Sequence, residues 1–128
     1  MATAITEGIK VCVEATYQPE YSSPHQHHYV FTYKVTIENN SPNTIQLLRR
    51  RWEVSDAGQQ VRIIEGDGVV GQQPILEPGY SHQYVSGCNL NSGKGKMKGN
   101  YYMERIQDGK TITVTIPEFQ LIADIFHN

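Results

Sequence analysis

Apolar and polar residues alternate along several stretches of the chain. The clearest alternation covers residues 27–38, where one face collects Tyr29, Phe31, Tyr33, Val35 and Ile37. A period of two residues predicts a half-buried β-strand, and the β-branched and aromatic content of this stretch favours a strand over a helix. The same alternation predicts strands over residues 9–17, 80–85, 96–105 and 110–116.

The stretch 44–55 also reads as a strand, but it has apolar residues on both faces. One face holds Ile45 and Leu47, and the other holds Leu48, Trp52 and Val54. Either the strand is central and covered on both faces, or a β-bulge changes its phase near Leu47 and Leu48. Residues 49–51 are all arginines. At least one of them is therefore expected to share a face with Trp52.

Turn-forming residues separate the predicted strands. Clusters of Gly, Pro, Asn, Asp and Ser occur at residues 18–26, 39–43, 56–58, 86–95 and 107–109. A short strand is predicted over 60–65, and no long amphipathic helix is predicted. The chain thus predicts an all-β fold of seven or eight strands, an immunoglobulin-like or fibronectin type III-like antiparallel β-sandwich. Residues 119–126 are expected to extend the last strand or to form a short helical tail.

Composition narrows the class of protein. A length of 128 residues fits a single domain over 1–128, with a core at about 9–121. A net charge of −2 does not favour nucleic acid as a partner. No apolar run reaches the ~20 residues of a membrane-spanning helix, and the N-terminus lacks a signal-peptide pattern. We expect a cytoplasmic protein in which Cys12 and Cys88 are free thiols.

The one apparent functional motif is the glycine pattern Gly66-x-Gly68-x-x-Gly71. In dinucleotide-binding folds such a pattern opens a helix whose N-terminal amides bind the pyrophosphate. Here Pro74 follows three residues after Gly71, and no helix is predicted. We therefore interpret the glycines as residues that permit positive φ angles in a tight loop. The alternative is a nest of backbone N–H groups beside Asp67 that binds a phosphorylated compound or pyrophosphate.

Metal and catalytic signatures are weak. His25 and His27 would point the same way in a strand, as two metal ligands should, but no third ligand is evident. We therefore predict no metal site and no cofactor. No nucleophile elbow and no catalytic cysteine signature is present, so the chain is not predicted to be an enzyme. A hydrolase that uses Asp67 and a histidine is the remaining catalytic alternative.

Two basic segments are candidates for binding an acidic partner. The first is the arginine run 49–51, and the second is the segment 94–98, in which Lys94 and Lys96 fall on one face. If the two segments meet in space, they can hold a phosphate group or an acidic peptide. The alternative is that the lysines form an ordinary solvated face and that an arginine stacks on Trp52.

A set of short motifs occurs in order along the chain: Gln46-Leu47-Leu48, Arg50-x-Trp52, Gly66-x-Gly68-Val69-Val70-Gly71-x-Gln73-Pro74, Pro78-Gly79, Tyr84-x-Ser86-Gly87, Met97-x-Gly99-x-Tyr101-x-Met103 and Ile116-Pro117-x-Phe119-x-Leu121. Each motif alone is weak, but the ordered combination is specific. It resembles the bacterial ApaG family over about residues 9–121.

The resemblance implies a fibronectin type III-like sandwich in a cytoplasmic bacterial protein. The family label, cobalt and magnesium efflux, implies a link to divalent cation homeostasis. Related domains in eukaryotic F-box and polymerase-associated proteins look like interaction modules. By analogy, we expect a non-catalytic module that binds an unknown protein partner. The expected surface comprises Arg50, Trp52, Gly66, Asp67, Gly68, Gly71, Lys94 and Lys96. Edge strands also permit a homodimer.

Overall fold

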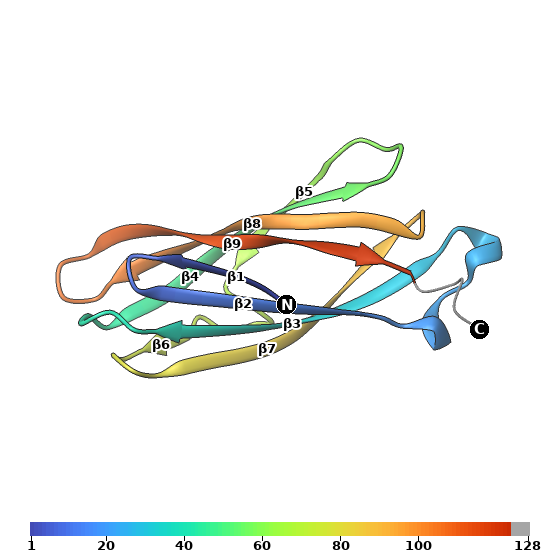
Figure 1. Cartoon of the computed structure of the whole chain (residues 1–128). Coiled ribbons are helices and arrows are strands. Elements are labelled where there is room, and N and C mark those ends of the chain that lie inside the picture. Colours follow the sequence, from blue (N-terminus) through green and yellow to red (C-terminus); the bar gives the residue numbers. More distant parts are fainter. Residues whose placement is uncertain (124–128) are drawn as a thin grey trace.

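The computed structural model describes residues 1–123, which form two layers of β-sheet (Figure 1). The described residues contain nine strands: β1 (Ala2–Thr6), β2 (Ile9–Tyr17), β3 (Tyr29–Asn39), β4 (Ile45–Asp56), β5 (Arg62–Asp67), β6 (Ile75–Leu76), β7 (Ser81–Leu90), β8 (Lys94–Arg105) and β9 (Lys110–Ile122). Two single-turn 3₁₀ helices, η1 (Pro19–Tyr21) and η2 (Pro24–Gln26), join β2 to β3. The predicted tail beyond Ala123 lies outside the described residues.

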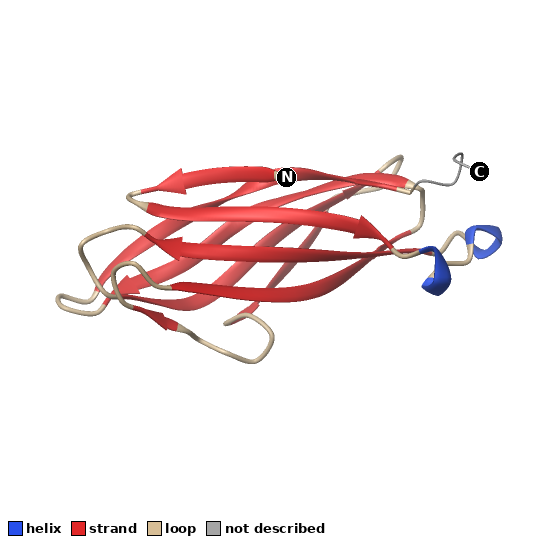
Figure 2. Cartoon of the chain, turned by 60° about the horizontal axis from the view of Figure 1, so that its bottom comes forward, coloured by secondary structure: helices blue, strands red, loops and turns tan. Residues whose placement is uncertain are grey.

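Every strand pairing is antiparallel, and the strands form two sheets. One sheet has the order β1-β2-β3-β7, and the other has the order β5-β4-β8-β9, with the short β6 paired to the start of β4. The strands run lengthwise, so that the longer loops gather at the two ends (Figure 2). The predicted antiparallel β-sandwich is therefore confirmed.

The core fills the space between the two sheets. The predicted inward face of β3 is buried, and Trp52 from β4 lies opposite it with 2% of its surface exposed. The Trp52 ring meets Tyr33 edge-on at a centroid distance of 5.3 Å and Phe119 at 5.9 Å. Burial of these large rings, together with edge-to-face packing, is the main favourable contribution of the core.

Two parts of the fold differ from the sequence-based expectation. Sequence patterning does not predict β1, because its alternation uses small side chains such as Ala2 and Ala4, which give little apolar signal. The loop predicted over 86–95 is only the three residues 91–93, because β7 and β8 extend into a tight hairpin. The glycine, asparagine and serine content of this segment is typical of a loop, although most of it pairs with neighbouring strands.

β9 continues through Pro117 to Ile122, so residues 119–122 follow the first of the two alternatives, an extension of the last strand. Proline lacks an N–H group and normally interrupts a β-ladder. Here the register between β8 and β9 shifts between Met97 and Gly99, opposite Pro117. The irregularity removes the need for the missing hydrogen bond, so the strand can pass through the proline.

Close approach of β4 and β8 at this irregularity requires a glycine. A Cβ atom at Gly99 would lie only 2.0 Å from the carbonyl oxygen of Arg51 on β4. We expect Gly99→Ala to destabilise the protein by about 1–3 kcal/mol, because the strands must move apart. Thermal unfolding should show a Tm several degrees lower.

Gly87→Ala is the matched control for this prediction. A Cβ atom at Gly87 would lie at an ordinary 3.5 Å from the Phe31 carbonyl oxygen, in a strand of the other sheet. This substitution should change the Tm much less. A Tm for Gly99→Ala that matches the Gly87→Ala value would contradict the close approach of β4 and β8.

Candidate functional site

The strand β5 leaves the body of the sandwich. The β4–β5 hairpin projects beyond the other strands (green in Figure 1). β5 lies at the end of its sheet and pairs only with β4. Ile63 on one face and Ile64 on the other are 47% and 39% exposed, and Val61, just before the strand, is 52% exposed. Proteins usually protect their edge strands, so an edge strand with exposed apolar residues on both faces indicates a binding site.

Strand alternation separates the three arginines of β4. Arg49 and Arg51 lie on the outer face, where they form ion pairs with Glu65 and Asp67 of β5 and with Glu53. These pairs are exposed to solvent, so each contributes little stability. Arg50 lies on the inner face with Trp52, which confirms that an arginine shares a face with the tryptophan.

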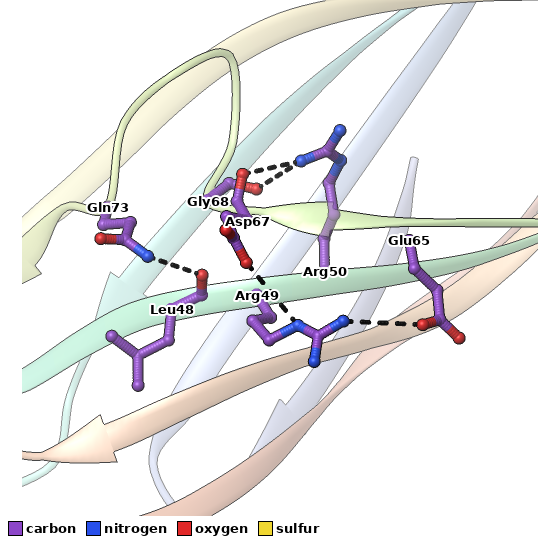
Figure 3. Close-up of polar contacts among 7 residues, drawn as sticks. All are labelled: Leu48, Arg49, Arg50, Glu65, Asp67, Gly68 and Gln73. Carbon is purple, nitrogen blue, oxygen red and sulfur yellow. Dashed lines mark hydrogen bonds and ion pairs between the residues drawn. The ribbon is translucent and has the colours of Figure 1, made fainter.

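A β-bulge in β4 supports the glycine loop, residues 66–73. The register between β4 and β8 shifts between Leu47 and Arg49, which is the second of the two alternatives for this strand, and leaves Leu48 unpaired with β8. The Leu48 carbonyl instead accepts a hydrogen bond from the Gly68 N–H at 2.8 Å. It accepts a second one from Gln73 Nε2 at 3.0 Å (Figure 3). The bulge thus leaves one carbonyl of β4 free to accept hydrogen bonds from a backbone N–H and from a side-chain amide of the loop.

Arg50 holds the other side of the same loop. Its Nη1 donates to the carbonyl oxygens of Asp67 and Gly68, both at 2.9 Å (Figure 3). The guanidinium lies over Gly66, where a Cβ atom would come within 2.9 Å of both Nη atoms. Gly66 therefore permits close approach of the arginine, and it has no positive φ angle because it belongs to β5.

The tip of the loop is a tight turn. Val69 and Gln72 exchange two backbone hydrogen bonds, of 2.8 and 3.0 Å, around Val70 and Gly71. Val70 and Gly71 have φ angles of 47° and 76°, and Gly68 has 61°. Positive φ angles at both central residues are the mark of primed hairpin turns. The interpretation of Gly68 and Gly71 as turn glycines is confirmed, and β5 leads into this turn without an α-helix.

The structure does not assemble the surface that the sequence suggested. Trp52 is expected on that surface, but its side chain belongs to the core. Lys94 and Lys96 lie on β8 rather than in a loop, and Lys96 is opposite Ser55 of β4. The glycine loop is bonded to Leu48, which lies seven residues before Ser55 on the same strand. At the usual rise per residue of a β-strand, the lysines and the glycine loop are therefore about 23 Å apart.

The histidines do not form the geometry expected of ligands. His25 lies in η2, and His27 follows it with a φ angle of 55°, so neither belongs to a strand; β3 begins only at Tyr29. The expectation that they point the same way along a strand is wrong. Within residues 1–123, no group of three or more His, Cys, Asp and Glu side chains could hold a metal ion.

A cavity of about 240 Å³ opens between the two sheets on the β5–β7 side. This inter-sheet cavity is lined by Tyr33, Arg50, Trp52, Arg62, Ile64, Ser86, Gly87, Cys88, Asn89 and Met97. Sequence reasoning missed Arg62, Cys88 and Tyr33 as site residues. The signal that could have found Arg62 is the register of the β4–β5 hairpin, which places it on the same face as Arg50 and Trp52.

Burial favours the neutral forms of the tyrosines and the cysteine at and near the cavity. Burial raises the pKa of Tyr33, Tyr84 and Tyr101, and the Tyr84 and Tyr101 hydroxyls hydrogen-bond to each other. Burial also raises the pKa of the Cys88 thiol, an effect that outweighs the opposing influence of Arg62. A thiol with a raised pKa is a poor nucleophile at neutral pH.

Replacement of individual glycines tests the role of the loop. Gly68→Ala should destabilise the protein more than Gly71→Ala, although both positions have positive φ angles. A Cβ atom at Gly68 would lie 2.2 Å from the Gln72 carbonyl oxygen, whereas a Cβ atom at Gly71 meets nothing within 4 Å. The Gly71 variant therefore shows the backbone strain alone, roughly 1–2 kcal/mol.

The difference between the two Tm values isolates the packing of the loop against Gln72. Equal Tm values for the two variants would contradict a loop closed against this residue. Circular dichroism of both variants should retain the strand signal, so that the loss is read as stability and not as a change of fold.

Known proteins identify the family. A family model described as the ApaG domain matches residues 19–105. Protein ApaG of Brucella suis biovar 1 is 46% identical over 121 residues, which cover 94% of this chain and 92% of the relative. An ApaA protein of Bordetella pertussis is 39% identical, with a TM-score of 0.87, and the match covers 91% of this chain and 94% of that chain. A protein from Archaeoglobus fulgidus, 11% identical over 89% of this chain and 97% of its own, shares the fold with a TM-score of 0.53.

No helix in residues 1–123 is long and apolar enough to cross a membrane.

The matching family model spans most of the strands, and the relatives match over nearly their whole length. The family that the ordered short motifs suggested is therefore the family whose members this chain resembles over nearly its whole length. This protein belongs to the ApaG family.

Proposed function

We propose that the protein is a non-catalytic interaction module of the cytoplasm that binds a partner protein at β5. The observation that supports this proposal is the exposure of β5 on both of its faces at the end of a sheet. One edge of β5 pairs with β4, and the opposite edge has no paired strand in residues 1–123. A free strand edge can accept an extended segment of another chain, with Ile63 and Ile64 as apolar contacts.

The other sheet ends are less suited to this role. β9 buries every second side chain along most of its length and packs against β1 and β2. β7 turns its alternate residues toward the core, so only one of its faces is open. Among β5, β7 and β9, β5 alone presents both faces, and a partner that covers it would bury apolar surface of Ile63 and Ile64.

The proposed link to cobalt and magnesium homeostasis rests on the family resemblance alone. We propose that the partner protein, and not this chain, acts on the metal ions, because the proposed contact surface is a strand edge and not a cluster of metal ligands. The alternative, a phosphorylated compound at the glycine loop, is less well supported. The Gly68 N–H and one Nη of Arg50 are already bonded to backbone carbonyls of the protein.

Photo-crosslinking in cells tests the proposal and captures the partner whatever its identity. Ile63 and Ile122 are replaced, one at a time, by a photo-reactive phenylalanine analogue. Both are exposed isoleucines on strands that end the same sheet, with 47% and 57% of their surface accessible. Adducts should form at position 63 and not at position 122, and an Ile64→Lys exchange on the same strand should remove them.

The products also distinguish the occupants. An adduct of twice the mass of the chain identifies a second copy as the partner, and any other mass is assigned by mass spectrometry. A third variant with the photo-reactive residue at Lys96 tests the lysine face that the sequence suggested. Adducts at Lys96 or Ile122 in place of Ile63 would contradict a partner site at β5.

A further inference from the structure

Two arginines without a carboxylate partner in the described residues line the inter-sheet cavity. Three of the five arginines, Arg49, Arg51 and Arg105, form ion pairs with acidic side chains. Arg50 and Arg62 form none within residues 1–123, and both line this cavity. No Asp or Glu belongs to the lining. The two guanidinium groups carry like charges and repel each other. An anion in the cavity between them offsets this repulsion.

The pairing of β4 with β5 places both arginines on the face of the hairpin that turns toward the other sheet. Trp52 is opposite Ile64, and Val54 is opposite Arg62, so these four side chains share a face. Arg50 belongs to the same face, because it is opposite Gly66. Glu53, Glu65 and Asp67 lie on the other face of the hairpin, where they pair with Arg49 and Arg51. Asp56, at the end of β4, accepts hydrogen bonds from Asn91 and Ser92 instead.

The hydrogen bonds of the two arginines leave donors unused. Both hydrogen bonds of Arg50 come from Nη1, so Nε and Nη2 have no protein acceptor in residues 1–123. Arg62 Nη2 donates to the Asn89 carbonyl oxygen at 2.7 Å and lies 4.0 Å from Cys88 Sγ. This contact bridges β5 to β7 and keeps the Arg62 guanidinium at the rim of the cavity.

A second, independent observation concerns Trp52. Its indole Nε1 is buried and has no hydrogen-bond partner in the described part of the chain. Trp52 lines the inter-sheet cavity with 2% of its surface exposed. A buried N–H group without an acceptor is costly, and native proteins keep few of them.

We propose that the inter-sheet cavity binds a small organic phosphate. Arg50 and Arg62 hold the phosphoryl oxygens through charge-assisted hydrogen bonds, and Trp52 Nε1 donates to an oxygen of the same ligand. Ile64, Met97 and the Trp52 ring provide an apolar wall for the organic part. This site goes beyond partner binding at β5, and it is separate from the glycine loop, whose residues do not line the cavity.

The lining argues against other ligands. A cation is disfavoured because the lining has two positive charges and no carboxylate. A cavity of about 240 Å³ is below the usual range for cofactor-sized ligands, about 300–1,000 Å³, and suits a smaller molecule. The lining is divided between polar donors and apolar side chains, so a ligand with an oxyanion and a short apolar body satisfies both.

The single tryptophan of the chain makes the test direct. Phenyl phosphate is titrated into the ¹⁵N-labelled full chain, while the one indole N–H signal and the intrinsic fluorescence are followed. Saturable shifts in both signals, with the same dissociation constant, are expected. Inorganic phosphate should bind more weakly because it lacks an apolar body, and phenylacetate should bind more weakly because it carries a single charge.

Two arginine variants provide the matched comparison. Arg62→Gln should weaken phenyl phosphate binding about tenfold or more, because it removes a charged donor from the cavity. Arg49→Gln removes the same charge from the outer face of the same hairpin and should change the dissociation constant less than twofold. Thermal unfolding of each variant verifies that it is folded, and Arg50→Lys provides a second cavity variant that retains the charge.

Several outcomes would overturn the proposal. The absence of a saturable indole shift at millimolar phenyl phosphate excludes the site. Equal losses for Arg62→Gln and Arg49→Gln would show general charge attraction instead of a bound ligand. Equal affinity for phenylacetate excludes selection for phosphate, and equal affinity for inorganic phosphate excludes the role of the apolar wall.

Discussion

The pairing of β4 with its neighbours is the constraint on which the rest of the structure depends. β4 pairs with β5, β6 and β8, so its phase determines which residues enter the core. The bulge after Leu47 sets this phase, and Trp52 turns inward while Arg49 and Arg51 turn outward. A slip of one residue would bring two arginines into the core and expose the tryptophan. The same bulge frees the Leu48 carbonyl that fastens the glycine loop.

The two long sides of the sandwich are not equivalent. On one side β9 packs against β1 and β2, and the Thr115 N–H donates to Thr6 Oγ1 at 3.1 Å. On the other side β5 packs closely only on β4, and Arg62 bridges it to β7. Both proposals concern this open side: the free strand edge for a protein, and the inter-sheet cavity for a small anion. An arginine that belongs to β5 and to the cavity offers a physical route by which ligand and partner could influence each other.

The sequence is sufficient to predict the sandwich and the inward face of β3, because these follow from local alternation. It offers the bulge in β4 as one of two alternatives, because an interrupted alternation also fits a strand that is covered on both faces. It is insufficient for the site, because residues that meet there come from different strands. Trp52 is expected on the binding surface together with Arg50, yet the structure buries it in the core and turns Arg49 and Arg51 outward. Lys94 and Lys96 can be assigned to one face, but their distance from the glycine loop depends on register. Alternation turns Tyr33 inward, and the β4–β5 register puts Arg62 on the face of Trp52, but only tertiary packing brings the two residues to one cavity.

Hydrogen–deuterium exchange of the purified protein tests most directly whether the β5–β7 side is open. Exchange rates follow local opening, which is easier where a strand has few buried contacts. Peptides that cover residues 59–67 should exchange much faster than those that cover 112–121 of β9, although both strands end the same sheet. Equal, strong protection of the two strands would mean that β5 is covered by the rest of the molecule, and this would contradict an open side available for binding.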